Sequence, residues 1–262
     1  MRCLALSLAI LALTTSIANA EVKTKVIQYQ VGDKTFDGYL AYDDAVEGPR
    51  PGVVVFHEWW GLNDYAKKRT EMLAELGYVA FAADMYGDGK FVEHPKDAGQ
   101  MAGTVRANVD QWQKRAVAAL DVLKKQPQCN AAKIAAIGYC FGGSTALQLG
   151  YTGADIDAIA TFHAALPTPS AEQAKAIKAK VLVCNGADDS FVSQDSINAF
   201  QEKLKDANVD LNFVAFPGAV HSFTVEDAGK HGNPGMQYNK EADEKSWTLL
   251  LELLKSELGT GK

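Results

Sequence analysis

The sequence predicts an α/β fold with a mostly parallel central sheet of about eight strands and helices on both faces. Short apolar, β-branched segments alternate with helical patterns along the chain, an order typical of parallel sheets with helices on both sides. Most of these segments are almost continuously apolar, as in strands buried on both faces. The chain has 262 residues, 47% of them hydrophobic. A single large domain is therefore expected.

The first twenty residues have the features of a cleaved export signal. Arg2 gives a short positive start, residues 4–13 are apolar, and Ala18-Asn19-Ala20 is a small-residue cleavage site. The apolar segment is too short to cross a bilayer comfortably, so no stable membrane anchor is expected. The sequence therefore predicts a signal peptide at residues 1–20, one domain at residues 21–262, and a periplasmic or secreted protein.

The expected strands fall into two groups. The first two are expected to form an antiparallel hairpin across Gly32-Asp33-Lys34, and the later ones are expected to be parallel. Strands are expected at residues 25–31, 36–42, 52–57, 79–84, 133–138, 158–163, 180–185 and 211–216. Helices are expected at residues 63–76, 105–125, 143–150, 193–207 and 241–258. The Gly- and charge-rich segment 87–95 is interpreted as a lid or a surface loop.

A glycine-rich turn follows the fifth expected strand. It reads Gly138-Tyr139-Cys140-Phe141-Gly142-Gly143 and precedes an expected helix, which is the context of a nucleophile elbow. Glycines are needed there because side chains would collide with neighbouring elements. At a helix N-terminus the dipole favours a thiolate, and free N–H groups can bind an oxyanion. The turn predicts Cys140 as the nucleophile. Ser144, inside the first helical turn, is the weaker candidate.

An acid and a base follow the nucleophile in the order expected for this elbow. Asp188 and Asp189 come after the expected strand 180–185, and His221 comes after the strand 211–216. Ligands bind beyond the carboxyl ends of strands in open parallel sheets, so these side chains should meet Cys140. His221 would pair with the thiol, and one aspartate would orient the imidazole. The pattern alone does not choose between the two aspartates.

Three cysteines remain after removal of the signal: Cys129, Cys140 and Cys184. An odd number leaves at least one thiol free or paired outside the chain. If Cys140 is free, the other two could form a disulfide. Cys184 lies inside an expected strand, however, which favours two buried, reduced thiols.

Charge and histidine spacing bear on the expected partners. The net charge is 26 − 32 = −6, and no block of Lys and Arg stands out, so nucleic acid is not an expected partner. No histidine lies at a metal-ligand spacing from another ligand-type residue, so neither a metal nor another cofactor is expected. We expect a small-molecule substrate and a monomer or small homo-oligomer.

These segments resemble the dienelactone hydrolase family of the α/β-hydrolase fold, over nearly the whole mature chain. The matching segments are the elbow 138–143, Gly186-Ala187-Asp188-Asp189-Ser190-Phe191-Val192, His221-Ser222-Phe223 and His57-Glu58-Trp59-Trp60-Gly61-Leu62-Asn63. The cysteine elbow is the most specific of them, because most relatives within the wider fold use serine. The resemblance assigns the acid to Asp189. It also implies that Glu58 holds the resting thiol and frees a thiolate once substrate binds.

Two departures from the family concern its substrate and its location. Family members that hydrolyse dienelactone carry two arginines that clamp the substrate carboxylate, and neither matching position is Arg here. One segment reads Tyr86-Gly87-Asp88-Gly89-Lys90, and His221 is followed by Ser222-Phe223-Thr224-Val225. A lysine such as Lys90 lacks the planar fork that grips a carboxylate. Export is the second departure, since the aromatic-degradation enzymes are typically cytoplasmic.

The sequence thus predicts an exported hydrolase that cleaves an ester or lactone through a Cys-His-Asp triad and a thioester intermediate. Backbone N–H groups of Phe141 and Trp59 are expected to bind the oxyanion. Trp60 and Tyr86, with Trp59, are expected to wall an apolar substrate pocket. Two other hypotheses remain: a thiol-redox protein that uses Cys140, and a non-catalytic binding protein on the same fold.

Overall fold

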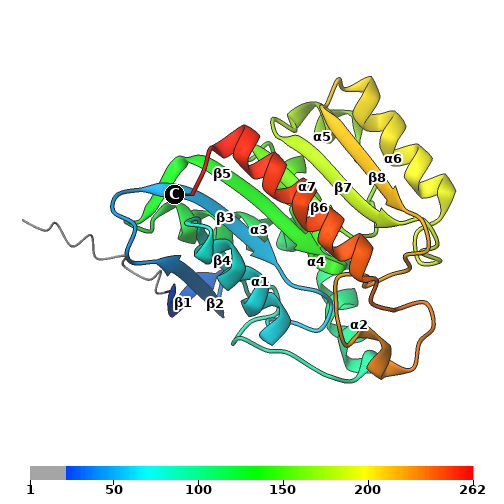
Figure 1. Ribbon diagram of the computed structural model, residues 1–262, viewed down its shortest axis with the longest axis horizontal. Helices are drawn as coiled ribbons and strands as arrows, with labels where there is room; N and C mark the ends of the chain where they lie inside the picture. Colours follow the sequence, from blue (N-terminus) through cyan, green and yellow to red (C-terminus); the bar gives the residue numbers. More distant parts are fainter. Residues whose placement is uncertain (1–21, 262) are drawn as a thin grey trace, which may run out of the picture.

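Eight strands form one sheet in the computed structural model of the protein, which describes residues 22–261 (Figure 1). Their order across the sheet is β1-β2-β4-β3-β5-β6-β7-β8. β2 pairs antiparallel with β1 and with β4, and all other neighbours are parallel. The predicted hairpin and mostly parallel sheet are therefore confirmed. The strands are β1 (Val22–Val31), β2 (Lys34–Asp43), β3 (Arg50–Phe56), β4 (Val79–Ala83), β5 (Cys129–Tyr139), β6 (Ala158–Phe162), β7 (Lys180–Gly186) and β8 (Leu211–Phe216).

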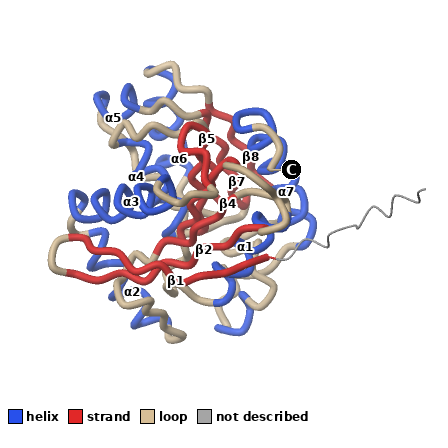
Figure 2. The backbone as a smooth tube through the Cα atoms, turned by 90° about the vertical axis from the view of Figure 1, so that its left-hand side faces the viewer, coloured by secondary structure: helices blue, strands red, loops and turns tan. Residues whose placement is uncertain are grey.

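Helices cover both faces of this sheet, and each face has its own hydrophobic core (Figures 1 and 2). α1 and α7 pack on one face, while α3 and α4 pack on the other. Because β3, β4 and β6 lie between the two layers, nearly all of their side chains are buried. The helices are α1 (Asp64–Glu75), α2 (Pro95–Arg106), α3 (Val109–Lys124), α4 (Phe141–Tyr151), α5 (Ala171–Ala176), α6 (Gln194–Asp206) and α7 (Lys240–Leu258), with a 3₁₀ turn η1 at Ala228–His231.

The helix predicted at residues 105–125 is wrong at its beginning. The chain forms two helices there, because Asn108 leaves the helical conformation and its side chain accepts a hydrogen bond from the Gln111 N–H at 3.0 Å. Such a cap satisfies a donor that has no partner within the helix. α2 and the six-residue α5 were not predicted at all.

The segment 87–95 is a surface loop held by hydrogen bonds at both of its ends. The Asp84 carboxylate accepts the N–H groups of Gly87 and Gly89 at 2.8 Å each. Further along, the Val92 N–H donates to the Trp60 carbonyl at 2.8 Å. The loop is thereby fastened against the segment that follows β3.

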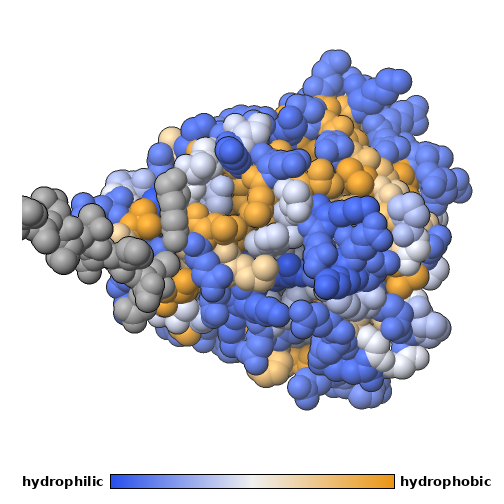
Figure 3. Space-filling model, viewed as in Figure 1, coloured by the Kyte–Doolittle hydropathy of each residue, from blue (hydrophilic) through white to orange (hydrophobic). Residues whose placement is uncertain are grey.

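Within residues 22–261, no helix is both long and apolar enough to cross a bilayer. The face seen in Figure 3 is mostly hydrophilic, and hydrophobic side chains show mainly beside α7. The predicted signal peptide lies outside the described residues.

Candidate active site

The five side chains nearest the chemistry come from loops at the carboxyl ends of five different parallel strands. Glu58 follows β3, Cys140 follows β5, His163 follows β6, Asp189 follows β7 and His221 follows β8. The fold thereby brings His221 within hydrogen-bond distance of Cys140, 81 positions away in the sequence, and of Asp189, 32 positions away. These residues therefore lie at the edge of the sheet where the sequence predicted the site.

The turn at Cys140 is strained and closely packed. Cys140 has φ 52° and ψ −114°, a conformation that residues other than glycine rarely adopt. A Cβ on Gly138 would lie 2.0 Å from the Gly142 carbonyl oxygen, and one on Gly142 would lie 2.1 Å from the Phe56 carbonyl oxygen. Only glycine fits these two positions, so the predicted reason for the glycines is confirmed. The strain places the thiol at the N-terminus of α4.

Cys140, His221 and Asp189 form a hydrogen-bonded row. The His221 Nε2 lies 3.1 Å from the Cys140 Sγ, and the His221 Nδ1 lies 2.8 Å from the Asp189 Oδ2. The other Asp189 oxygen accepts the Phe191 N–H at 2.9 Å. Burial disfavours the imidazolium, but the neighbouring thiol and carboxylate favour it more strongly and raise the pKa of His221 to about 10. The row can therefore hold a thiolate beside an imidazolium.

The two rival residues lie elsewhere. Asp188 is exposed, and its carboxylate accepts the Gly218 N–H at 3.0 Å, as an aspartate that stabilises a turn does. The Ser144 hydroxyl donates to the Ala165 carbonyl at 2.7 Å and is buried. Neither residue contacts His221.

The two predicted oxyanion donors belong to the first turn of α4 and to the loop after β3. Phe141 is the first residue of α4, so its N–H has no partner within the helix. Trp59 belongs to the loop after β3, and the Tyr86 hydroxyl fixes that loop by donating to the Trp59 carbonyl at 2.8 Å. Tyr86 is buried against the rings of His57 and Phe141. It therefore supports the loop that carries Trp59, whereas its predicted role as a wall of the substrate pocket stays a prediction.

Glu58 is buried beside the triad, but no hydrogen bond joins it to Cys140. Ser222 donates to the Glu58 Oε1 at 3.3 Å, and the His163 Nδ1 lies 3.9 Å from the same oxygen. Burial raises the pKa of Glu58 to about 7, against the opposing effect of nearby His221. In this geometry the thiol faces His221, whereas the family resemblance has Glu58 holding it in the resting state.

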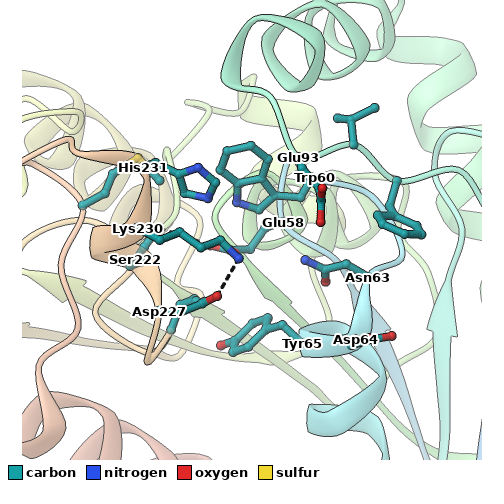
Figure 4. A pocket seen from close by; sticks show the side chains of 15 residues that line it. Glu58, Trp60, Asn63, Asp64, Tyr65, Glu93, Ser222, Asp227, Lys230 and His231 are labelled. Carbon is teal, nitrogen blue, oxygen red and sulfur yellow. Dashed lines mark hydrogen bonds and ion pairs between the residues drawn. The ribbon is translucent and has the colours of Figure 1, made fainter.

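A cavity of about 290 Å³ lies beside Glu58, which forms part of its lining (Figure 4). Trp60 forms one wall and stacks on His231, with ring centroids 4.3 Å apart. Lys230 lies at the rim and pairs with Asp227 at 2.5 Å. The cavity is lined by Glu58, Trp60, Asn63, Asp64, Tyr65, Phe91, Val92, Glu93, Ser222, Val225, Asp227, Ala228, Lys230, His231 and Met236.

The three described cysteines are all free thiols. Cys129 and Cys184 are buried, and burial raises the pKa of Cys129 to about 11 and of Cys184 to about 12. The interpretation of these two as reduced, buried thiols is confirmed. Their thiolate forms are scarce at neutral pH, so they are poor nucleophiles.

Three further residues lie near the site, and the sequence assigned none of them to it; for His163, which ends an expected strand, it favoured a hydrogen-bonded structural role. His163 contacts the ring of His221, with centroids 5.2 Å apart. Phe191 is half exposed beside the same ring, with centroids 5.1 Å apart. Arg106, at the end of α2, lies over the ring of Phe141, 5.4 Å from its centroid. The position of Arg106 depends on α2, which was not predicted. Among residues 22–261, no group of three or more His, Cys, Asp or Glu could hold a metal ion.

The fold and the elbow define an α/β-hydrolase, because a mostly parallel sheet carries a strained nucleophile turn at the start of a helix. A family model described as the dienelactone hydrolase family matches residues 36–258. The chain belongs to the dienelactone hydrolase family. The predicted enzyme class, a hydrolase of carboxylic esters or lactones, is confirmed at this level.

Similar proteins agree with this assignment. A solved structure of a dienelactone hydrolase-like promiscuous phosphotriesterase from metagenomic libraries is 41% identical, has a TM-score of 0.88, and is matched over 91% of this chain and 99% of that one. Protein usf of Aquifex pyrophilus is 29% identical over 207 residues, which are 77% of this chain and 87% of that protein. A dienelactone hydrolase from Anabaena variabilis, 18% identical with a TM-score of 0.66 over 90% and 99% of the two chains, supports the fold alone.

Proposed function

We propose that this protein hydrolyses carboxylic esters or lactones through Cys140, His221 and Asp189, with a thioester intermediate. The observation that carries the proposal is the row of contacts at 3.1 Å and 2.8 Å that ends on a thiol at a helix N-terminus. A thiol, a base and an orienting carboxylate are the parts required for nucleophilic catalysis. The alternatives of redox chemistry and ligand binding do not require this alignment.

The first half-reaction transfers the acyl group to sulphur. The Cys140 proton passes to the His221 Nε2, and the thiolate attacks the substrate carbonyl. The N–H groups of Phe141 and Trp59 bind the resulting oxyanion. As the tetrahedral intermediate collapses, the bond between carbon and the leaving oxygen breaks, and His221 returns its proton to the alkoxide. The products at this stage are an alcohol and a thioester on Cys140.

Water completes the cycle. His221 takes a proton from a water molecule, whose oxygen attacks the thioester carbonyl. The carbon–sulphur bond then breaks, His221 returns its proton to the sulphur, and a carboxylic acid and the free thiol result. Asp189 keeps the Nδ1 of His221 protonated throughout and stabilises the imidazolium, without itself taking a proton.

The central test is replacement of the nucleophile. Cys140→Ala removes one sulphur atom, and hydrolysis of p-nitrophenyl esters should fall at least ~10³-fold in kcat while the circular dichroism spectrum is unchanged. Cys129→Ala is the matched control, because it removes a buried thiol from the start of β5, and it should retain wild-type activity. Retained activity in Cys140→Ala would overturn the proposed mechanism.

Alkylation separates the hydrolase from the alternatives. Iodoacetamide should modify Cys140 alone, because burial raises the pKa values of Cys129 and Cys184. Modification should abolish ester hydrolysis stoichiometrically. A protein that loses a peroxide-reducing activity instead, and hydrolyses no ester, would fit the thiol-redox hypothesis.

We propose a neutral, partly apolar substrate. Four carboxyl groups line the cavity beside Glu58: Glu58 itself, Asp64, Glu93 and Asp227. The ammonium of Lys230 is already paired with Asp227. Lys90 does not line the cavity and pairs with Asp88 at 3.0 Å in an exposed position. A substrate carboxylate would therefore meet more negative than positive charge here, whereas Trp60 and Phe91 offer apolar surface.

A second candidate activity is the hydrolysis of phosphotriesters. The observation that favours it is the 41% identity over nearly the full chain to a protein described as a promiscuous phosphotriesterase. The same thiolate would attack phosphorus instead of carbon and expel the phenolate or alkoxide, which takes its proton from His221; water would then break the sulphur–phosphorus bond and release a phosphodiester. Paraoxon and p-nitrophenyl acetate release the same chromophore, so parallel assays of wild type and Cys140→Ala test both activities at once.

We also propose that the protein is exported after cleavage behind Ala20. The supporting features are the positive start, the apolar residues 4–13 and the small residues at positions 18 and 20. Mass spectrometry of the N-terminus, after expression of the full chain in a bacterial host and osmotic shock, should give Glu21 as the first residue. An uncleaved chain in the cytoplasm would contradict this.

A further inference from the structure

His163 combines complete burial with a strained backbone. Its φ is 40°, and Cys140 and Ser222 beside it also have positive φ, at 52° and 57°. Such conformations cost free energy and persist where the surroundings impose them, often at functional sites. His163 follows β6, and its N–H donates to the Cys184 carbonyl at 2.8 Å. The side chain is 0% exposed.

The two ring nitrogens of His163 have different environments. Nε2 lies 2.8 Å from the Thr224 Oγ1. Nδ1 has no hydrogen-bond partner among the described residues, although it is buried, and it faces the Glu58 Oε1 at 3.9 Å. A buried, unpartnered polar atom next to a carboxyl group is costly unless it interacts with that group.

A chain of hydrogen bonds fixes which nitrogen carries the proton. It begins at the Arg69 Nε–H, which donates to the Tyr65 hydroxyl oxygen at 3.3 Å. The Tyr65 and Thr224 hydroxyls are 2.6 Å apart. If Tyr65 donates to Thr224 and Thr224 donates to the His163 Nε2, both hydroxyl hydrogens have acceptors and the proton of His163 is on Nδ1. A proton on Nε2 instead leaves the hydroxyl hydrogen of either Tyr65 or Thr224 without an acceptor within the described residues.

We propose that His163 is a positioning residue that presents an Nδ1–H to the Glu58 carboxylate and holds that carboxylate ready beside the triad. Ser222 and His163 both address Oε1, which leaves Oε2 free to act on the thiol or the substrate. At 3.9 Å the contact is longer than a hydrogen bond. It therefore acts as a charge–dipole attraction, which is strong in a buried site.

Several other groups act on the ionisation of these two side chains. Those that face Glu58 are His221 and Ser222 on the loop after β8, Asp227 further along it, Arg69 and Tyr65 on α1, and Tyr139 at the end of β5. Burial, together with His221 and Arg69, lowers the pKa of His163 well below its ordinary value. His163 is thus a neutral dipole, and the position of its proton determines its effect.

The inference rests on the proposed role of Glu58 in the triad mechanism, but its first test needs no activity. In protein labelled with ¹⁵N-histidine, long-range ¹H–¹⁵N spectra report the tautomer of each imidazole, and the His163→Asn variant assigns the His163 signals. We expect a neutral Nδ1–H tautomer from pH 6 to pH 8. An Nε2–H tautomer overturns the proposal, whatever the enzyme hydrolyses.

The second test uses a matched pair of variants. In His163→Asn, the amide N–H can replace the Nδ1–H, and Asn tolerates positive φ. His163→Leu removes the donor. The pH at which kcat/KM is half-maximal on the acid side should rise by about one unit in the Leu variant, with about a tenfold lower kcat. In the Asn variant, this acid-side midpoint should stay at the wild-type value.

The comparison of the two His163 variants with the wild type tests the proposal directly. Equal acid-side midpoints in the Leu variant and the wild type mean that His163 only fills space, and the proposal fails. If the Leu variant does not fold, the tautomer result decides alone. A failure of the proposed hydrolase mechanism would show separately, as ester hydrolysis that survives in Cys140→Ala.

Discussion

Replacing Glu58 by Gln should make the protein more stable at alkaline pH than the wild type, while removing most of its activity. Burial raises the pKa of Glu58 from 4.5 to about 7. A folded state that holds the proton more tightly than the unfolded state loses stability as pH rises between these two values. Each pKa unit corresponds to about 1.4 kcal/mol, so the ionised carboxylate costs about 3 kcal/mol above pH 7. Gln does not ionise and avoids this cost.

The measurement is the pH dependence of the difference between the two proteins. Urea unfolding of wild type and Glu58→Gln at pH 5 and pH 8.5 gives two values of ΔΔG. The packing of the Gln amide contributes equally to ΔΔG at the two pH values, so the difference between the two ΔΔG values reports only the ionisation of Glu58. We expect ΔΔG to change by about 2.5 kcal/mol from pH 5 to pH 8.5, in favour of the variant. Glu93→Gln is the control, because Glu93 lines the same cavity but is exposed. Its two ΔΔG values should agree within about 0.5 kcal/mol.

As pH rises, the activity of the wild type should increase while its stability falls. The ionised carboxylate stabilises the His221 imidazolium, so wild-type kcat/KM should rise with pH through about 7, following the Glu58 carboxyl. Glu58→Gln should lose this rise and about 10²-fold in kcat. Parallel stability curves for Glu58→Gln and wild type would refute the reasoning, because they would mean that Glu58 ionises as freely when folded as when unfolded.

Two further predictions concern the acid and the substrate. Asp189→Asn should lower kcat by about 10⁴-fold, because its oxygen orients the imidazole, while Asp188→Asn should lower it by less than about tenfold; the reverse ranking in p-nitrophenyl ester assays would reassign the acid. A neutral aryl ester should have a higher kcat/KM than a carboxylate-bearing lactone of similar size at pH 7. If the anionic lactone is preferred, comparison of Lys90→Ala with Arg106→Gln shows which cation holds it, and the neutral-substrate reading is wrong.

Much of the fold could be predicted because its strands are short apolar segments that are typical of buried strands. β3, β4 and β6 are buried on both faces, and that burial is what their continuous apolar composition indicates. α2 was missed because Gly99 and Gly103 within it disfavour helix. α5 is too short for a periodic pattern to be visible.

The grouping of the triad residues could be predicted from their positions after successive strands, but the residues around the triad could not. The elbow glycines and His221 have local patterns that can be read from the chain. The contact between His163 and Glu58, by contrast, joins loops that are over a hundred residues apart, and it depends on a backbone conformation that no local pattern indicates. The position of Arg106 over Phe141 depends in turn on the missed helix.

The strand order divides the triad between the middle and the margin of the sheet. Cys140 follows β5, which has paired strands on both sides, whereas His221 follows β8, the last strand at one edge. β8 pairs only with β7 and is largely open to solvent on its outer side. The imidazole is therefore positioned from the outermost strand and from the backbone hydrogen bonds that join His221 to Gly235 and Gln237, whereas the elbow rests on interior strands.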